Sequence, residues 1–253
     1  MSFMEKTEFE FEKVFDVEDY LFIYNPLLTQ EVNEAQSNFI DEVLKLEKGS
    51  KILDLCCGFG RVTNILAEKG YSMSGLDSSA EFLQIARQEA EKKQLKVMYY
   101  QDDMRNFEFV NEFDAVINIF TSFGYFCDKD NFKVLQGISN SLKKGGKFLL
   151  DMFNREYILK NYLPYVVTKR EESYIVEINS FDIINSRNCT ERILFRDGIT
   201  KKANFFVRAY TFTEIKYLLS KVGLKVTTTF GNYKTDEPYT LNSRRMIVLS
   251  IKA

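Results

Sequence analysis

The chain has 253 residues, enough for one full hydrophobic core with room for a subdomain. Its hydrophobic and charged fractions, 45% and 28%, are those of an ordinary globular protein, and a net charge of −2 without a dense Lys/Arg block disfavours a nucleic-acid substrate. The sequence contains no histidine, which excludes Ser-His-Asp and Cys-His mechanisms. Any general base must therefore be Asp, Glu, Tyr, Lys or Cys.

No apolar run is long enough to span a bilayer, and residues 1–13 lack the apolar core of a signal peptide, so we expect a cytoplasmic protein. The four cysteines are Cys56, Cys57, Cys127 and Cys189. They form no C-x-x-C pair, and no histidine is available to complete a zinc site. We therefore expect free, buried thiols and no metal.

The N-terminal stretch, residues 1–24, is aromatic and acidic, which fits an amphipathic helix or a lid over a site. Pro26 marks a break. Thr29 then begins a capping pattern, and apolar residues spaced for one face predict a helix to about Leu46.

Residues 51–61 read K-I-L-D-L-C-C-G-F-G-R, the pattern of a buried strand, a glycine turn and the start of a helix over 61–70. Glycines in such a turn let backbone N–H groups approach a ligand, and the helix adds its positive N-terminal end. The same pattern also fits an ordinary tight turn without a ligand.

Three more predicted strands follow, over 71–76, 96–101 and 114–119, and each ends in polar or special residues. An open parallel sheet binds its ligands at the carboxyl ends of its strands. Asp77, at the tip of the second strand, can accept from both hydroxyls of a ribose. Ser78 or Ser79 can cap the next helix, which runs to about Lys93.

The fourth strand leads into an unusually aromatic segment, Asn118-Ile119-Phe120-Thr121-Ser122-Phe123-Gly124-Tyr125-Phe126. Thr121 and Ser122 could orient an acceptor, or they could satisfy loop backbone. A helix over 130–142 and a fifth strand over 147–152 follow. From about residue 165 the sequence pattern changes to one typical of antiparallel strands. Alternating runs at 165–170, 173–182, 187–197 and 199–210 predict an inserted antiparallel sheet that ends at Arg208 and Tyr210.

A helix over 211–222 and strands over 224–230 and 245–252 complete the predicted fold, the last strand being antiparallel. The long loop 231–244 between those strands is of a length that is often functional. We predict one α/β domain, 1–253, with a Rossmann-like, seven-stranded, mostly parallel sheet. A lid occupies about 1–30, and a small β cap occupies about 163–210, inserted after strand five.

Five motifs together resemble the class I S-adenosylmethionine (SAM)-dependent methyltransferases. They are the runs at 54–60, 75–79, 103–105, 113–114 and 142–147. Cys56 replaces the first glycine of the usual acid-x-G-x-G-x-G pattern, and Gly58 is kept. Residues 121–126 and 243–246 look like a bacterial subgroup similar to small-molecule N-methyltransferases, including those that act on amino sugars.

The resemblance implies SAM as cofactor and a role for each matching residue. Tyr24 would close over SAM, and the backbone around Cys56, Cys57 and Gly58 would hold its methionine end. Asp77, with Ser78 beside it, would hold the ribose. The remaining cofactor candidates are Asp103, which would accept from the adenine amino group, Met104, which would pack beside the ring, and Asn118, which resembles the first residue of an [N/D]-P-P-[F/Y] motif whose prolines are missing here.

The candidates for the acceptor pocket are Thr121, Ser122, Tyr125 and Arg208. In similar enzymes the inserted sheet roofs this pocket or builds a homodimer contact. We expect methyl transfer to a small-molecule acceptor, with nitrogen favoured because a neutral amine needs no strong base. An oxygen acceptor would need deprotonation, with help from Tyr125 or Asp151.

Three rival functions remain. A dinucleotide-dependent oxidoreductase would need glycine where Thr63 stands. A SAM-binding module without turnover would fit the lack of an obvious catalytic side chain. An RNA methyltransferase is disfavoured by the charge.

Overall fold

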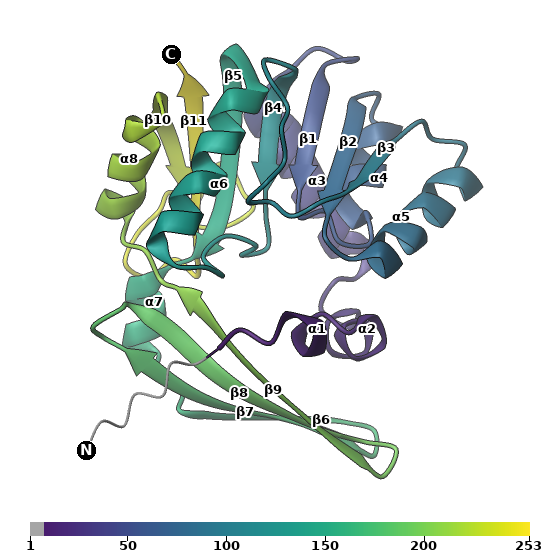
Figure 1. The fold of residues 1–253 in the computed structure, drawn as a ribbon, viewed down its shortest axis with the longest axis vertical. Coiled ribbons are helices and arrows are strands. Elements are labelled where there is room, and N and C mark those ends of the chain that lie inside the picture. Colours follow the sequence, from purple (N-terminus) through teal and green to yellow (C-terminus); the bar gives the residue numbers. More distant parts are fainter. Residues whose placement is uncertain (1–7) are drawn as a thin grey trace.

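A seven-stranded sheet forms the centre of the computed structural model, which describes residues 8–253 (Figure 1). Its strand order is β10-β11-β5-β4-β1-β2-β3. Strands β1 to β5 pair in parallel, whereas β11 runs antiparallel to both β5 and β10. The strands are β1 (Lys51–Leu55), β2 (Ser72–Asp77), β3 (Met98–Gln101), β4 (Phe113–Asn118), β5 (Leu142–Phe153), β10 (Leu224–Phe230) and β11 (Arg245–Lys252).

Helices cover both faces of this sheet, as a parallel sheet requires. The apolar sides of α6 (Asp128–Ser141) and α8 (Phe212–Lys221) pack on one face, and those of α3 (Gln30–Leu44) and α4 (Arg61–Glu68) on the other. Helix α5 (Ala80–Lys92) lies against β2 and β3. The predicted α/β fold is confirmed.

Local capping explains where three of the helices begin. The hydroxyl of Thr29 accepts from Val32 N at 3.3 Å before α3, and Ser79 accepts from Phe82 N at 3.2 Å before α5. Thr211 and Glu214 form a complete capping box at α8. Ser79, and not Ser78, therefore supplies the side-chain cap of α5.

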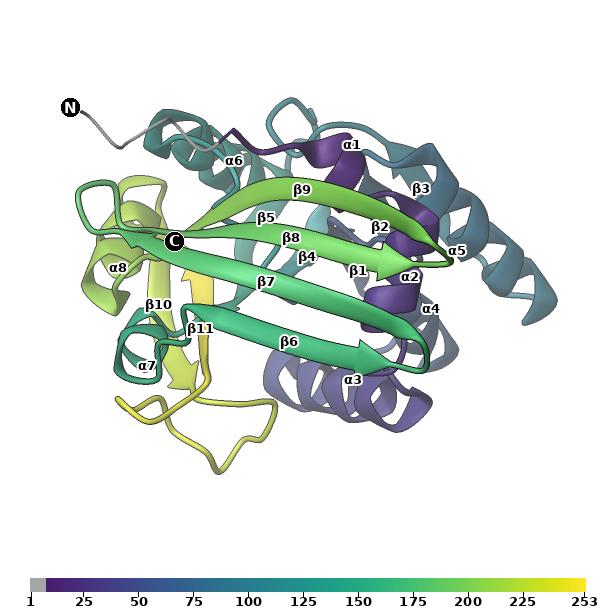
Figure 2. The ribbon, with the colours of Figure 1, turned by 90° about the horizontal axis from the view of Figure 1, so that it is seen from below.

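A second, four-stranded antiparallel sheet lies across one end of the main sheet (Figures 1 and 2). We call this sheet the cap. Its strands, in the order β6-β7-β8-β9, are β6 (Tyr165–Arg170), β7 (Ser173–Asp182), β8 (Arg187–Arg196) and β9 (Ile199–Arg208). A short helix that the sequence did not predict, α7 (Arg155–Lys160), leads from β5 into it.

Two short helices, α1 (Phe11–Val14) and α2 (Val17–Tyr24), lie between the cap and the main sheet (Figure 1). Glu10 N donates to Asn204 O at 3.0 Å, and Asn204 N donates to Glu10 Oε2 at 2.6 Å. These two hydrogen bonds attach the segment before α1 to the edge strand β9. The first seven residues of the expected lid lie outside the described residues.

One expectation about the cysteines is wrong. Cys57 and Cys189 are buried and Cys56 is half-buried, but Cys127 is exposed where α6 begins.

Within residues 8–253 no helix is both long and apolar enough to cross a membrane. Over the same range, His, Cys, Asp and Glu side chains form no group of three that could hold a metal ion.

Candidate active site

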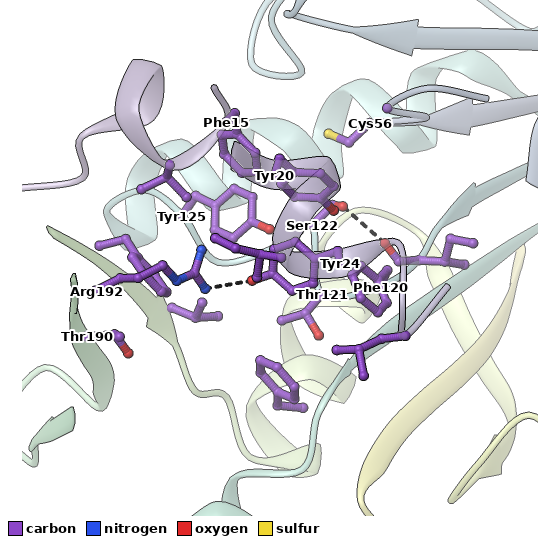
Figure 3. A pocket seen from close by; sticks show the side chains of 18 of the residues that line it. Phe15, Tyr20, Tyr24, Cys56, Phe120, Thr121, Ser122, Tyr125, Thr190 and Arg192 are labelled. Atoms are coloured by element: carbon purple, nitrogen blue, oxygen red, sulfur yellow. Dashed lines mark hydrogen bonds between the residues drawn. The ribbon is translucent and has the colours of Figure 1, made fainter. Parts of the chain in front are cut away.

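A cavity of about 550 Å³ lies between the glycine turn after β1, the N-terminal helices and the cap (Figure 3). Residues 56–59 form one wall, and residues 119–122 with Tyr125 form a second. Tyr20 and Tyr24 of α2 cover it, and the inner side chains of the cap close it from the far side. The cavity thus joins three parts of the chain that are far apart in sequence.

The glycine turn combines left-handed backbone with one crowded and one open position. Cys56, Gly58 and Gly60 have φ of 64°, 54° and 75°. A Cβ on Gly60 would lie 2.5 Å from Tyr99 Oη, whereas a Cβ on Gly58 would meet nothing within 4 Å. Gly60 is therefore needed for packing, and Gly58 leaves its backbone accessible to a ligand.

Asp77 lies beside this turn, because β1 and β2 pair in parallel and Leu55 is in register with Leu76. The carboxylate of Asp77 accepts from Gly58 N at 2.8 Å and from Ser79 N at 3.0 Å. Burial raises its pKa, while these donors act in the opposite direction. The glycine and the acid that the sequence analysis singled out are thus in direct contact.

Asp77 itself is not among the residues that line the cavity, and neither are the other predicted cofactor residues at the ends of β2 and β3. Asp103 accepts from Arg105 Nε at 3.0 Å, and this guanidinium lowers the pKa of the carboxyl. Met104 is buried within the main core. Ser78 accepts from Gln101 Nε2 through its carbonyl at 3.3 Å.

Two buried side-chain oxygens near the cavity have no hydrogen-bond donor within the described part of the chain. They are Oδ1 of Asp54, on β1, and Oδ1 of Asn118, at the end of β4. Each side chain is fixed through its other polar atom: Thr63 Oγ1 donates to Asp54 Oδ2 at 2.6 Å, and Asn118 Nδ2 donates to Leu55 O at 2.8 Å. Burial raises the pKa of Asp54 to about 6. Buried oxygens of this kind call for a donor, and the ammonium of a bound SAM fits that need.

Aromatic rings line the cavity above the turn. The rings of Tyr24 and Phe120 meet edge to face at 5.9 Å between centroids, and Tyr20 lies 4.5 Å from Tyr24 (Figure 3). Aromatic faces attract a sulfonium and exclude water. Tyr125 is half-buried, and desolvation raises the pKa of its hydroxyl well above the usual value.

The segment after β4 is held in an unusual conformation. Phe120 and Thr121 both have left-handed backbone, with φ of 60° and 61°. Asp151, which is fully buried, accepts from Phe120 N at 2.7 Å and from Arg245 at 2.7 and 2.6 Å, and also from the hydroxyl of Tyr233. Arg245 donates further to Thr121 Oγ1 at 2.8 Å. This buried network stabilises a strained turn at the cavity wall.

The cap contributes a buried cation. Arg192 donates to Glu177 at 3.0 and 2.8 Å and to the hydroxyl of Tyr24 at 2.7 Å (Figure 3). Thr190, on the same inner face, donates to Asn179 at 2.8 Å. The inner face of the cap therefore brings polar side chains to the cavity, beside apolar ones such as Ile175 and Val207.

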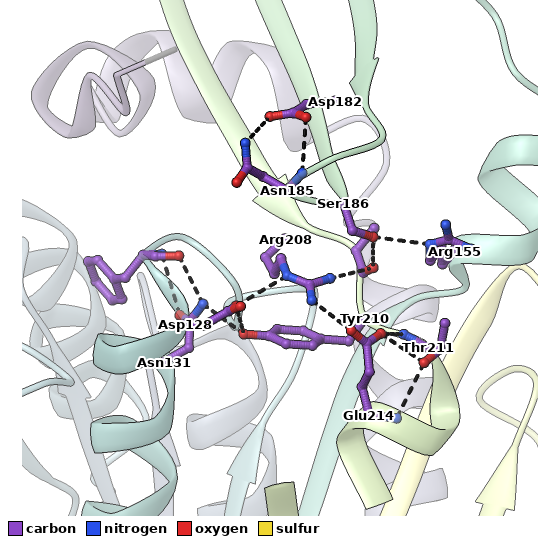
Figure 4. Close-up of polar contacts among 12 residues, drawn as sticks. Asp128, Asn131, Arg155, Asp182, Asn185, Ser186, Arg208, Tyr210, Thr211 and Glu214 are labelled. Carbon is purple, nitrogen blue, oxygen red and sulfur yellow. Dashed lines mark hydrogen bonds and ion pairs between the residues drawn. The ribbon is translucent and has the colours of Figure 1, made fainter. Parts of the chain in front are cut away.

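Arg208 lies elsewhere. Its guanidinium donates to Asp128 at 3.1 Å and to Glu214 at 2.7 Å, and Tyr210 donates to the same Asp128 oxygen at 2.9 Å (Figure 4). These contacts tie the end of β9 to α6 and α8. The structure does not support the sequence-based assignment of Arg208 to the acceptor pocket, because it is not among the residues that line the cavity.

Of the predicted residues, the cavity brings together Tyr24, Cys56, Cys57, Gly58, Thr121, Ser122 and Tyr125. Sequence reasoning missed several others that line it, among them Arg61, Glu177, Arg192 and Arg245. For Arg61 a signal existed, since it directly follows the glycine turn. Arg245 also had one, since it lies in the motif at 243–246. For Glu177 and Arg192, nothing in the local sequence marks the cavity side.

Comparison with known proteins adds independent evidence. Residues 52–146 match the family described as methyltransferase domain. A protein of Geobacillus sp. (strain WCH70) that is named as a methyltransferase is 25% identical over 93% of this chain and 99% of its own length. A glycine/sarcosine N-methyltransferase from Parasynechococcus marenigrum (strain WH8102) is 29% identical over 80% of this chain and 73% of its own.

Solved structures show the same fold. A SAM-dependent methyltransferase from Clostridium acetobutylicum ATCC 824 has a TM-score of 0.80 at 24% identity, over 93% of this chain and 98% of that one. A SAM-bound amino pentose methyltransferase from Micromonospora echinaspora has a TM-score of 0.67 at 17% identity, over 86% and 90%. Residues 52–146 thus match a methyltransferase domain, and over most of its length the chain has the fold of the SAM-dependent methyltransferases.

Proposed function

We propose that this enzyme transfers the methyl group of SAM to the nitrogen of a small-molecule amine held between residues 119–125 and the cap. The proposal rests on the protonation state of the side chains that line the cavity. Burial raises the pKa of Tyr20, Tyr125 and the thiols of Cys56 and Cys57, so these groups stay neutral near pH 7. The two carboxylates that line the cavity are already engaged, Asp54 by Thr63 and Glu177 by Arg192. A hydroxyl acceptor needs a base, whereas a neutral amine already carries its lone pair.

In this proposal the ends of the parallel strands hold the cofactor. The backbone around Cys57 and Gly58 faces the methionine end, Asp77 accepts from the ribose hydroxyls, and Asp103 accepts from the adenine amino group. Tyr24 covers the site from above. When bound, SAM supplies a methyl group that its positive sulfur has already activated.

The acceptor would lie on the opposite side of the cavity, against Thr121, Ser122, Tyr125 and the polar side chains of the cap. The protein's main task is then alignment, which can be worth roughly 7–11 kcal/mol of the barrier in favourable cases. Nitrogen is also the acceptor in the name of the glycine/sarcosine relative, and the pentose methyltransferase acts on an amino sugar by its title.

A matched acceptor panel tests the proposal. The enzyme is incubated with trideuteriomethyl SAM and pairs of compounds that differ only in an amino or a hydroxyl group, including glycine with glycolate and amino sugars with their parent sugars. We expect S-adenosylhomocysteine and a trideuteriomethylated product from one or more amines. Labelling of the hydroxyl partner in place of its amine would refute nitrogen transfer.

A variant sharpens the result. Tyr125→Phe removes the hydroxyl but keeps the ring. If Tyr125 only packs and orients, kcat of the variant with an accepted amine stays within about fivefold, since loss of one hydrogen bond is worth roughly 1 kcal/mol. A kcat that falls by several orders of magnitude would instead make Tyr125 a proton-transfer group and favour an oxygen acceptor.

A further inference from the structure

Arg61 is the first residue of α4 and directly follows the glycine turn. It lines the cavity, and its guanidinium carbon lies 5.1 Å from the centroid of the Phe120 ring. The side chain is thus placed where the turn, the strained segment after β4 and the cavity meet.

The partners of Arg61 are neutral. Its Nη1 donates to Oδ1 of Asn33 at 2.9 Å and to the side-chain oxygen of Gln36, both buried on α3. No ion pair of Arg61 occurs within residues 8–253, whereas the cavity cations Arg192 and Arg245 each pair with an acid. The two amides fix the guanidinium in place without neutralising it.

The cavity wall around Arg61 therefore divides by charge. Arg61 and the N-terminal end of the eight-residue helix α4 present positive charge. The unpartnered oxygens of Asp54 and Asn118, on the neighbouring strands, are acceptors, and an ammonium can donate hydrogen bonds to them. A ligand end that carries one carboxylate and one ammonium fits both halves.

We propose that Arg61 is the counter-ion of the methionine carboxylate of SAM, held in position by Asn33 and Gln36. The proposal rests on SAM binding in this cavity. Arg61 would add a cation to the cofactor contacts made by the glycine turn and Asp77. Because Asn33 and Gln36 lie on α3, which has no other part in the site, this helix would also influence the affinity for the cofactor.

The test compares two ligands by titration calorimetry. S-Adenosylhomocysteine carries the carboxylate, whereas 5′-methylthioadenosine keeps the adenine, the ribose and the thioether but lacks the whole amino-acid end. Arg61→Gln should weaken S-adenosylhomocysteine by roughly 10- to 100-fold, the range for a charge-assisted hydrogen bond. Its affinity for 5′-methylthioadenosine should change less than threefold, which also shows that the variant is folded.

Arg87→Gln is the matched control, because Arg87 is an exposed cation on α5 that donates to Tyr99 O and is not among the cavity residues. Neither ligand should be affected by it. Unchanged affinity of Arg61→Gln for S-adenosylhomocysteine, or an equal loss for both ligands, would overturn the proposal. A raised KM for the acceptor alone would assign Arg61 to the acceptor instead. Failure of the unaltered enzyme to bind S-adenosylhomocysteine would refute the assumption of a SAM site rather than the role of Arg61.

Discussion

Replacing Arg245 by methionine should destabilise the fold far more than the loss of an ordinary surface charge. Asp151 is fully buried, and Arg245 supplies two of its hydrogen bonds, at 2.7 and 2.6 Å. Arg245→Met keeps most of the volume of the side chain but removes the only cation paired with this carboxylate in the described part of the chain.

The size of this loss of stability depends on the hydrogen-bond donors that Asp151 retains in the variant. Breaking a buried ion pair from one side costs about 3–5 kcal/mol. Phe120 N and the hydroxyl of Tyr233 still donate to Asp151 in the variant, so we expect the lower end, about 3 kcal/mol. For a chain of this length that corresponds to a fall in Tm of roughly 6–12 °C.

Urea unfolding followed by circular dichroism measures this loss. The matched control is Lys234→Met, since Lys234 pairs with Glu237 on the surface at 2.8 Å and solvent screening leaves such exposed pairs with little effect on stability. Arg245→Lys keeps the charge but not the two-point contact of the guanidinium, so its loss of unfolding free energy should lie between those of the two variants. A loss below about 1 kcal/mol in Arg245→Met, with an unchanged m-value, would refute the reasoning that this pair holds the turn at Phe120.

Three further outcomes follow from the same geometry. Gly60→Ala should fold poorly in thermal melts, because its Cβ would lie 2.8 Å from Ala86 Cβ. Gly58→Ala should cost only about 1 kcal/mol of stability in the same melts, yet calorimetry should show weaker SAM binding. Asp77→Asn should weaken S-adenosylhomocysteine by at least about tenfold; unchanged affinity would reject the ribose assignment. Without cofactor, Asp54 should make stability fall by about 3 kcal/mol as pH rises from about 3 to about 7, because its pKa is raised from 3.8 to about 6, and Asp54→Asn should remove that component of the pH profile.

The main sheet could be predicted from sequence because its signals are local. The parallel strands are largely apolar runs with polar or special residues at or just beyond their ends, and the two strands at 224–230 and 245–252 have the predicted bounds. The contact between Gly58 and Asp77 follows from parallel register alone. Chemistry placed at strand ends is therefore readable from a sequence once the strands are found.

The cavity wall opposite those strands could not be predicted, since its contacts join distant parts of the chain. Arg192 reaches Tyr24 across 168 positions, and Arg245 reaches Asp151 across 94. The left-handed conformation of Phe120 and Thr121 has no local signal either, because aromatic and β-branched residues avoid it. Tertiary contacts impose it through Asp151.

The N-terminal helices and the cap form one continuous cover over the cavity. Glu18 and Asp19 of α2 accept from Arg196 at 2.7 Å and from Lys201 at 2.6 Å, so α2 is tied to β8 and β9 by charge. Tyr24 ends that helix, accepts from Arg192 of the cap and meets Phe120 of the wall. Any shift of the cap toward an acceptor must therefore move Tyr24 relative to the cofactor side. We therefore expect the binding of cofactor and of acceptor to be coupled through this one tyrosine, in which case thermodynamic linkage makes the coupling equal in both directions.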